Sequence, residues 1–80
     1  MKREDIEAKV IEIIAEKADC EVSEVKEQTN LEETLCLDSL DRVEVIMNIE
    51  KEFCITIADD DAEKAITTKD CVDLVEKYKK

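Results

Sequence analysis

Apolar residues recur at the three- and four-residue spacing of an amphipathic helix in three separate segments of the chain. We predict a first helix over about 4–18, a second over 39–53 and a last over 69–79. A shorter third helix is predicted over about 60–64, where acidic residues suit the positive end of a helix. The predicted fold class is therefore all-α: a four-helix bundle with three longer helices, one short third helix and a long loop between the first two.

Each longer helix carries one apolar stripe that we assign to the core. The loop over 19–38 is unusually long for a compact domain, so we expect apolar side chains to pin it, with a turn at Thr29 and Asn30. In the extended connector 54–57, Ile55 or Ile57 should enter the core, and Thr67 and Thr68 should cap the last helix. The predicted core residues are Ile6, Val10, Ile13, Ile14, Ala18, Val45, Ile46, Ile49, Phe53, Cys71, Val72, Leu74, Val75 and Tyr78, and the predicted loop pins are Val22, Val25, Leu31, Leu35 and Leu37.

The second helix has a further apolar group, Leu40, Val43 and Met47, on a different face. A bundle helix needs only one buried stripe, so this group is either extra core or an exposed patch on which a partner docks. Arg42 projects toward the core stripe. We expect its stem to pack while the guanidinium reaches a helix end or a carboxylate.

Composition narrows the chemistry that the chain can perform. Eighty residues without Gly, Pro, Trp or His read as one small helical domain, spanning 1–80. The absence of His excludes Ser-His and Cys-His nucleophile pairs and His metal sites, and the absence of Gly excludes a glycine-rich phosphate loop. The acidic run 59–61 lacks the ligand alternation and central Gly of a calcium loop. We therefore expect neither an independent enzyme nor a metal site.

A net charge of −11 disfavours nucleic acid and anionic membranes as partners and favours basic protein surfaces in fast encounters. No secretory signal or apolar run long enough to span a membrane is present, so we expect a cytoplasmic protein without stable membrane insertion. We also expect a monomer. Cys20, Cys36, Cys54 and Cys71 show no metal-binding spacing and are interpreted as reduced thiols that behave as small buried hydrophobes.

The tetrapeptide 37–40 contains the strongest functional signal. It places the hydroxyl of Ser39 at the start of the second helix, directly after the carboxylate of Asp38. Such a serine is a poor nucleophilic catalyst, because no nearby group can take its proton. It is a suitable attachment point for a phosphodiester, since backbone N–H groups at a helix start favour phosphate. The alternative is that Asp38 and Ser39 merely cap the helix.

The chain resembles the acyl carrier protein family over nearly all of its 80 residues, most densely from 37 to 68. The segment 38–41, Asp-Ser-Leu-Asp, resembles the family's phosphopantetheine attachment motif. Val43, Glu44, Met47 and the segment 50–53 are similar to its recognition helix, and 57–64 resembles its short third helix with the loop before it.

Four departures from the family pattern accompany this resemblance. Cys36 stands where the family usually has Gly, and Ala58 where it usually has Pro. Arg42 occupies a position at which a small residue is common, and an extra residue lies near Ala65. None of them removes the candidate attachment serine. They leave open whether the chain serves the main fatty-acid pathway or a specialised one.

The resemblance implies that a phosphopantetheinyl transferase attaches phosphopantetheine from coenzyme A to Ser39, next to Asp38 and Leu40, and that its thiol carries acyl groups as thioesters in fatty-acid biosynthesis. It implies a face that docks onto basic patches of the transferase and of acyl-transfer and chain-elongation enzymes. The implied docking residues are Asp38, Leu40, Asp41, Val43, Glu44, Met47, Glu50 and Glu63. The implied acyl pocket comprises Val45, Ile46, Ile49, Phe53, Ile57 and Ile66, all of which would also pack an empty core.

Two alternatives remain at this point. The chain could be a carrier dedicated to a polyketide, an aminoacyl group or a modified lipid, because cargo is chosen by partner enzymes. It could also be a non-carrier interaction module of the same fold that uses its acidic helix for docking alone. Replacement of Ser39 by Ala distinguishes the second alternative, since it would inactivate a carrier and leave an adaptor functional.

Overall fold

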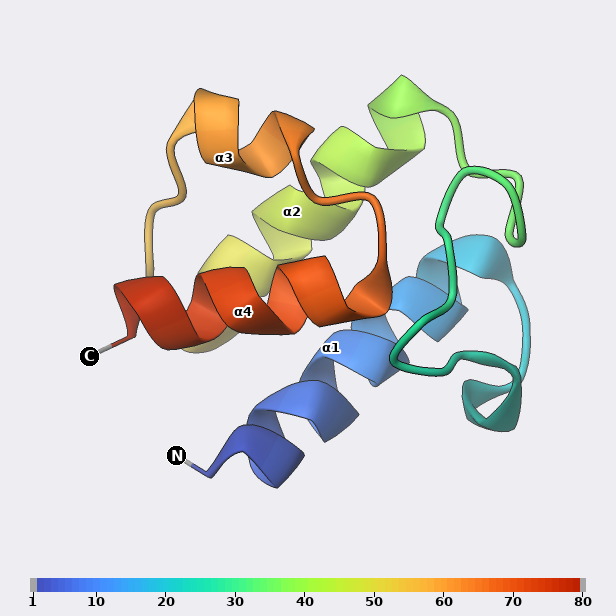
Figure 1. Ribbon diagram of the computed structural model, residues 1–80, viewed down its shortest axis with the longest axis horizontal. Helices are drawn as coiled ribbons and strands as arrows, with labels where there is room; N and C mark the ends of the chain where they lie inside the picture. The colour runs from blue at the N-terminus through green and yellow to red at the C-terminus, as the bar shows by residue number, and fades with distance from the viewer. Residues whose placement is uncertain (1, 80) are drawn as a thin grey trace.

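The computed structural model describes residues 2–79, which form four α-helices and one short 3-10 helix (Figure 1). The predicted all-α class is confirmed, and each predicted helix start and end lies within one residue of the observed one. The 3-10 helix was not predicted. Residues 2–79 contain no strand, only an isolated bridge between Asn30 and Thr67. The elements are α1 (Arg3–Ala18), η1 (Val22–Glu24), α2 (Ser39–Phe53), α3 (Asp59–Glu63) and α4 (Thr68–Tyr78).

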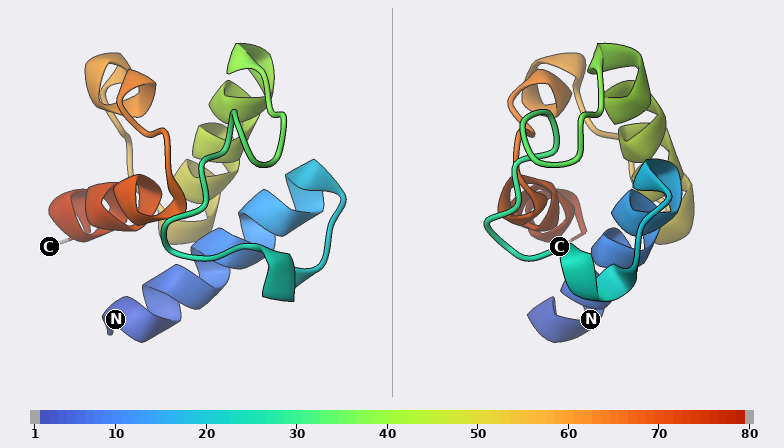
Figure 2. Two further views of the ribbon diagram at one scale, coloured as in Figure 1. Left: turned by 45° about the vertical axis from the view of Figure 1, so that its right-hand side comes forward. Right: turned by 90° about the vertical axis from the view of Figure 1, so that its right-hand side faces the viewer.

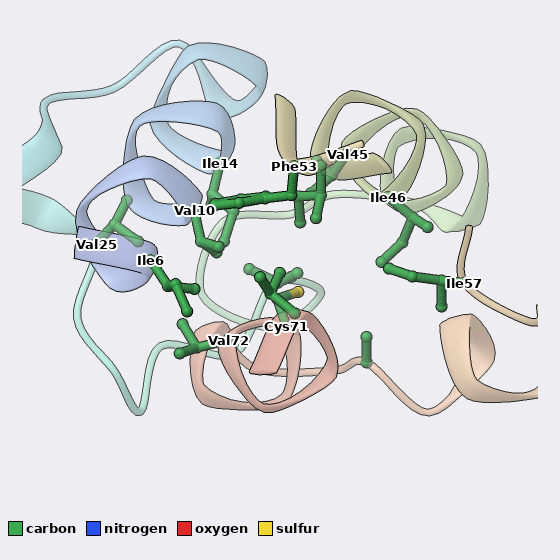
Figure 3. Packing of buried hydrophobic residues seen from close by; sticks show 14 of the residues in the cluster. Ile6, Val10, Ile14, Val25, Val45, Ile46, Phe53, Ile57, Cys71 and Val72 are labelled. Carbon is green, nitrogen blue, oxygen red and sulfur yellow. The ribbon is translucent and has the colours of Figure 1, made fainter. Parts of the chain in front are cut away.

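The core lies between α1, α2 and α4, and α3 stands to one side of it (Figure 2). The predicted stripes are largely confirmed. Figure 3 shows Val10 and Ile14 of α1, Phe53 of α2 and Cys71 of α4 meeting at its centre. The predicted core residues that are only partly buried are Ile13, Ala18, Leu74 and Tyr78, whereas Ala15 is buried without having been predicted.

The long loop between α1 and α2 is held by the start of α4. Leu31 N donates to Ile66 O at 2.8 Å, and Lys69 N donates to Glu27 O at 2.9 Å. The side chain of Asn30 accepts from the backbone of Glu32 and Glu33, which confirms a turn at this point. Of the predicted pins, Val25, Leu31 and Leu37 are buried and Leu35 is partly buried.

Two predictions in the connecting segments are wrong. Val22 is exposed, because it lies in the 3-10 helix, where the chain turns back after α1 and Val25 takes the buried place. Thr67 accepts from Asp70 N and caps α4, but Thr68 is the first helical residue and is fully buried instead. Of the two connector candidates, Ile57 is the buried one and Ile55 is only partly buried.

The cysteines are free thiols, but only one of them behaves as predicted. Cys71 is buried, and burial raises the pKa of its thiol to about 12. Cys20 is partly buried, and Cys36 and Cys54 are exposed, so the expectation of four buried cysteines is wrong. The two exposed cysteines share an unusual backbone geometry: Cys36 (φ 58°), in the loop before α2, and Cys54 (φ 55°), the C-cap of α2, take the left-handed conformation that favours Gly. They substitute for glycine in a chain that has none.

The helix α3 differs from the other α-helices in having no buried residue. It is anchored by the buried Ile57 before it and Ala65 after it. The hydroxyl of Tyr78 donates to Asp61 and accepts from Ala58 N, and Lys77 Nζ donates to Asp61 at 3.1 Å. Polar contacts to the end of α4 therefore hold α3 in place beside α2. Within residues 2–79, no helix combines the length and apolar character needed to cross a membrane.

Candidate functional site

The start of α2 is capped by Asp38 rather than by Ser39. Asp38 Oδ1 accepts from Asp41 N at 2.9 Å, and Asp41 Oδ2 accepts from Asp38 N at 3.4 Å, which together form a capping box. This arrangement leaves the Ser39 hydroxyl out of the capping interaction. Ser39 is exposed, in the first turn of a fifteen-residue helix. The simple alternative, in which both residues serve only as caps, therefore accounts for Asp38 but not for Ser39.

Ser39 lies at the edge of a groove of about 530 Å³ between α2 and α3. Apolar side chains from both helices and from the connector between them form most of its surface. Ile46 of α2 and Ile57 of the connector point toward one another (Figure 3). The lining residues are Ser39, Arg42, Val43, Ile46, Met47, Glu50, Ile57, Asp59, Ala62 and Glu63.

A larger depression of about 680 Å³ lies between α1 and α2 and does not include Ser39. Its lining is mainly polar and charged: Ile13, Glu16, Lys17, Asn48, Lys51 and Glu52. We assign the candidate site to the smaller groove, because the only reactive group that the sequence singles out lies there and because its walls are apolar.

The six predicted acyl-pocket residues are divided between the groove and the core. Ile46 and Ile57 line the groove. Val45, Ile49 and Phe53 are at most 2% exposed and pack against α1 and α4 instead, so they do not line it. Ile66 is partly buried, and its carbonyl accepts from Leu31 N. Sequence reasoning missed Asp59 and Ala62, although Asp59, Ala62 and Glu63 share one face of α3 at i, i+3 and i+4 spacing.

The predicted docking face of α2 is partly open and partly engaged within the molecule. Leu40, Val43 and Met47 are 66%, 53% and 50% exposed, so they form an exposed patch and not extra core. Asp38 and Glu63 are exposed as well. The remaining three carboxylates, on Asp41, Glu44 and Glu50, are half-buried and have partners in the same chain.

Those three carboxylates bind a lysine and a backbone amide. Lys17 of α1 donates to Glu44 and lies 3.6 Å from Asp41 Oδ1, and the hydrogen bond to Glu44 raises the pKa of Lys17. Glu50 Oε2 accepts from Ile57 N at 2.8 Å, which holds the connector against α2. The open part of the face therefore consists of the apolar patch together with Asp38, the N-cap of α2, and Glu63, the last residue of α3.

Arg42 packs as predicted and links three segments. Its side chain is 17% exposed. Its Nη1 lies 3.4 Å from Glu32 Oε1 in the long loop and donates at 3.3 Å to the carbonyl of Ala65 after α3. The guanidinium thus reaches a carboxylate, one of the two expected destinations, and it also lines the groove one turn after Ser39.

Comparison with known proteins identifies the family. The family described as "Phosphopantetheine attachment site" matches residues 8–75. Proteins named "Acyl carrier protein" from two strains of Porphyromonas gingivalis are 42% identical over 73 residues, covering 91% of this chain and 94% of the relative. The chain belongs to the acyl carrier protein family. A solved acyl carrier protein structure from Enterococcus faecalis superposes with a TM-score of 0.78 at 37% identity, covering 94% of this chain and 95% of that one.

Acyl carrier proteins carry phosphopantetheine, and they are carriers and not catalysts. The group supplies a terminal thiol that holds an acyl chain as a thioester. The residues around Ser39 fit such a group, because its hydroxyl is exposed and the apolar groove begins at the same residue. In residues 2–79, no set of three or more metal-binding side chains is gathered at one place.

Proposed function

We propose that the chain is a discrete acyl carrier that holds acyl intermediates as thioesters on a phosphopantetheine arm attached to Ser39, in fatty-acid biosynthesis. The observation that carries this proposal is the free hydroxyl of Ser39 beside the groove, with capping performed by Asp38. Leu40, the next residue, is exposed and forms part of the surface on which the arm begins. One bundle, proposed to span residues 1–80 as a single domain, performs this function.

The attachment reaction must be catalysed by another protein. The chain has no His, and the carboxylate next to Ser39, that of Asp38, accepts the capping hydrogen bond. Asp41, one turn on, completes the capping box and lies near Lys17. Among residues 2–79, no hydrogen bond joins the Ser39 hydroxyl to either carboxylate. We therefore assign the removal of the serine proton to a phosphopantetheinyl transferase.

Partner enzymes are proposed to dock on the exposed patch of α2. Leu40, Val43 and Met47 supply the apolar contact, and Asp38 and Glu63 attract a basic surface. Asp41, Glu44 and Glu50 contribute negative potential while remaining bound within the chain. Acyl-transfer and chain-elongation enzymes with basic patches fit this surface, in short-lived contacts that let one carrier move between enzymes. The exposed free thiols of Cys36 and Cys54 suit a reducing cytoplasm.

The experiment that tests the attachment is intact-mass measurement before and after incubation with coenzyme A and a broad-specificity phosphopantetheinyl transferase. We expect a gain of one phosphopantetheine in the unmodified chain and none in Ser39→Ala. Ser23→Ala is the matched control, because Ser23 and Ser39 are the only serines and Ser23 is exposed in the 3-10 helix. It should gain the group in full. A folded chain that gains nothing, or a Ser39→Ala variant that is still modified, would refute the attachment and favour an interaction module.

A further inference from the structure

Lys17 of α1 reaches across to α2 and binds two carboxylates beside the exposed patch. Its ammonium group donates to Glu44 and lies 3.6 Å from Asp41 Oδ1. Glu44 lies four residues after Leu40 and three before Met47, so it shares their side of α2. A partner that docks on the patch therefore meets Glu44 with a lysine of the same chain already bound to it.

The surfaces on the two sides of the patch differ in charge. The depression between α1 and α2 has two lysines and two glutamates among its lining residues, so its charges balance. The groove between α2 and α3 has one arginine against three carboxylates. One of these, Glu63, is exposed and forms no ion pair within residues 2–79. Uncompensated negative charge next to the patch therefore lies on the α3 side.

We infer that Lys17 competes with the basic residues of partner enzymes for Glu44 and Asp41, which weakens docking and directs those basic residues toward Glu63. This inference rests on the proposed function, because it concerns the surface on which the transferase and the acyl-handling enzymes dock. The side chains of Lys17 and Glu44 are 29% and 44% exposed. Ion pairs with this much solvent contact are weak, so a partner's arginine can displace Lys17, and docking is weakened without being blocked.

The test measures kcat and KM of a broad-specificity phosphopantetheinyl transferase for the full chain, with the product followed by intact mass. Lys17→Gln releases both carboxylates, and we expect KM to fall about threefold at low salt. The value of kcat should stay the same, because the added attraction acts on docking and not on the chemical step. The difference in KM should shrink as salt is added, since salt screens exposed charges.

Lys9→Gln is the matched control. It makes the same change in net charge and also breaks an ion pair between α1 and α2, but with Glu52 at the other end of α2. It should change KM much less than Lys17→Gln does.

A second comparison uses the carboxylates themselves. In the chain that retains Lys17, Glu63→Gln should raise KM more than Glu44→Gln does, because Glu44 is already bound within the chain. In the Lys17→Gln background, Glu44→Gln should raise KM about threefold and so cancel the gain. The two single glutamate variants keep Lys17, so their comparison decides the matter even if Lys17→Gln fails to fold.

Three results would overturn the competition: an unchanged KM in folded Lys17→Gln, an equal fall in Lys9→Gln, or an equal effect of Glu44→Gln in both backgrounds. An effect of Glu44→Gln as large as that of Glu63→Gln, in the chain that retains Lys17, would overturn the preference for the α3 side. Failure of the proposed function looks different: the unsubstituted chain would gain no mass from coenzyme A, and the inference about docking would fall with it.

Discussion

The two walls of the groove are built in different ways. The wall formed by α2 has fifteen residues, a capping box and four buried side chains, Val45, Ile46, Ile49 and Phe53. The wall formed by α3 has five residues, no side-chain cap and no buried side chain. The first is held by the hydrophobic core, and the second by hydrogen bonds and an ion pair at Asp61. The rigid wall positions Ser39, and the lightly held wall can move without loss of the core.

The largest effect is expected where α2 enters the core. Phe53 is 2% exposed, so Phe53→Ala should lower the free energy of unfolding by about 3–5 kcal/mol. That is a large share of the roughly 4–12 kcal/mol typical of a domain of this length. Met47→Ala, on the exposed side of the same helix, should change it by no more than about 0.5 kcal/mol. Urea unfolding followed by circular dichroism measures both, and similar losses in the two variants would mean that α2 is not held by one buried stripe.

A smaller and more local effect is expected in α3. Tyr78→Phe removes the hydroxyl that joins Asp61 to Ala58 N and should lower the free energy of unfolding by about 1 kcal/mol. Hydrogen exchange at the Ala62 and Lys64 amides should accelerate, whereas exchange at Ile49 in α2 should keep its rate. Asp60→Asn, an exposed change in the same helix, is the control and should leave these rates unaltered. Equal acceleration in α2 and α3 would show that the two walls open together.

The variant Tyr78→Phe should also change how the stability of the fold depends on pH. The hydrogen bond from Tyr78, followed by that from Lys77, lowers the pKa of Asp61 below its ordinary 3.8. A carboxylate with a lowered pKa stabilises the folded state above its unfolded pKa, and this contribution is lost as pH falls through the lowered value. In Tyr78→Phe the pKa should move back up toward 3.8. A ¹³C titration of the Asp61 carboxyl measures it directly, and an unchanged value would remove Tyr78 from the explanation.

How much the sequence predicts also differs between the two walls. The α2 stripe was predictable because burial repeats with the helix, and a repeat is visible along the chain. Which residues of that stripe face α3 was not predictable, because this depends on how the helices pack against one another. Ile46 lines the groove, whereas Val45 and Ile49 do not.

Contacts between distant segments were also invisible to a local pattern. The carboxylate that Arg42 reaches, on Glu32, and its carbonyl partner, on Ala65, lie in loops whose paths no periodicity records. The Tyr78–Asp61 contact that holds α3 is of the same kind. By contrast, the sequence itself shows that Cys36 stands where the family usually has Gly. Only the positive φ of Cys36 explains why Gly is favoured at this position.

The smallest predicted effect concerns the C-terminal end of the rigid wall. Cys54 caps α2 in the left-handed conformation. This conformation costs a residue with a Cβ about 1–2 kcal/mol. A Gly in its place avoids that cost but loses about 0.5–1 kcal/mol more in backbone entropy on folding. Cys54→Gly should therefore raise the free energy of unfolding by up to about 1 kcal/mol. Thr56→Gly, a nearby exposed position without a positive φ, should lower it instead. If both variants are destabilised in urea, the left-handed cap of α2 is not strained, and the cysteine there is more than a substitute for glycine.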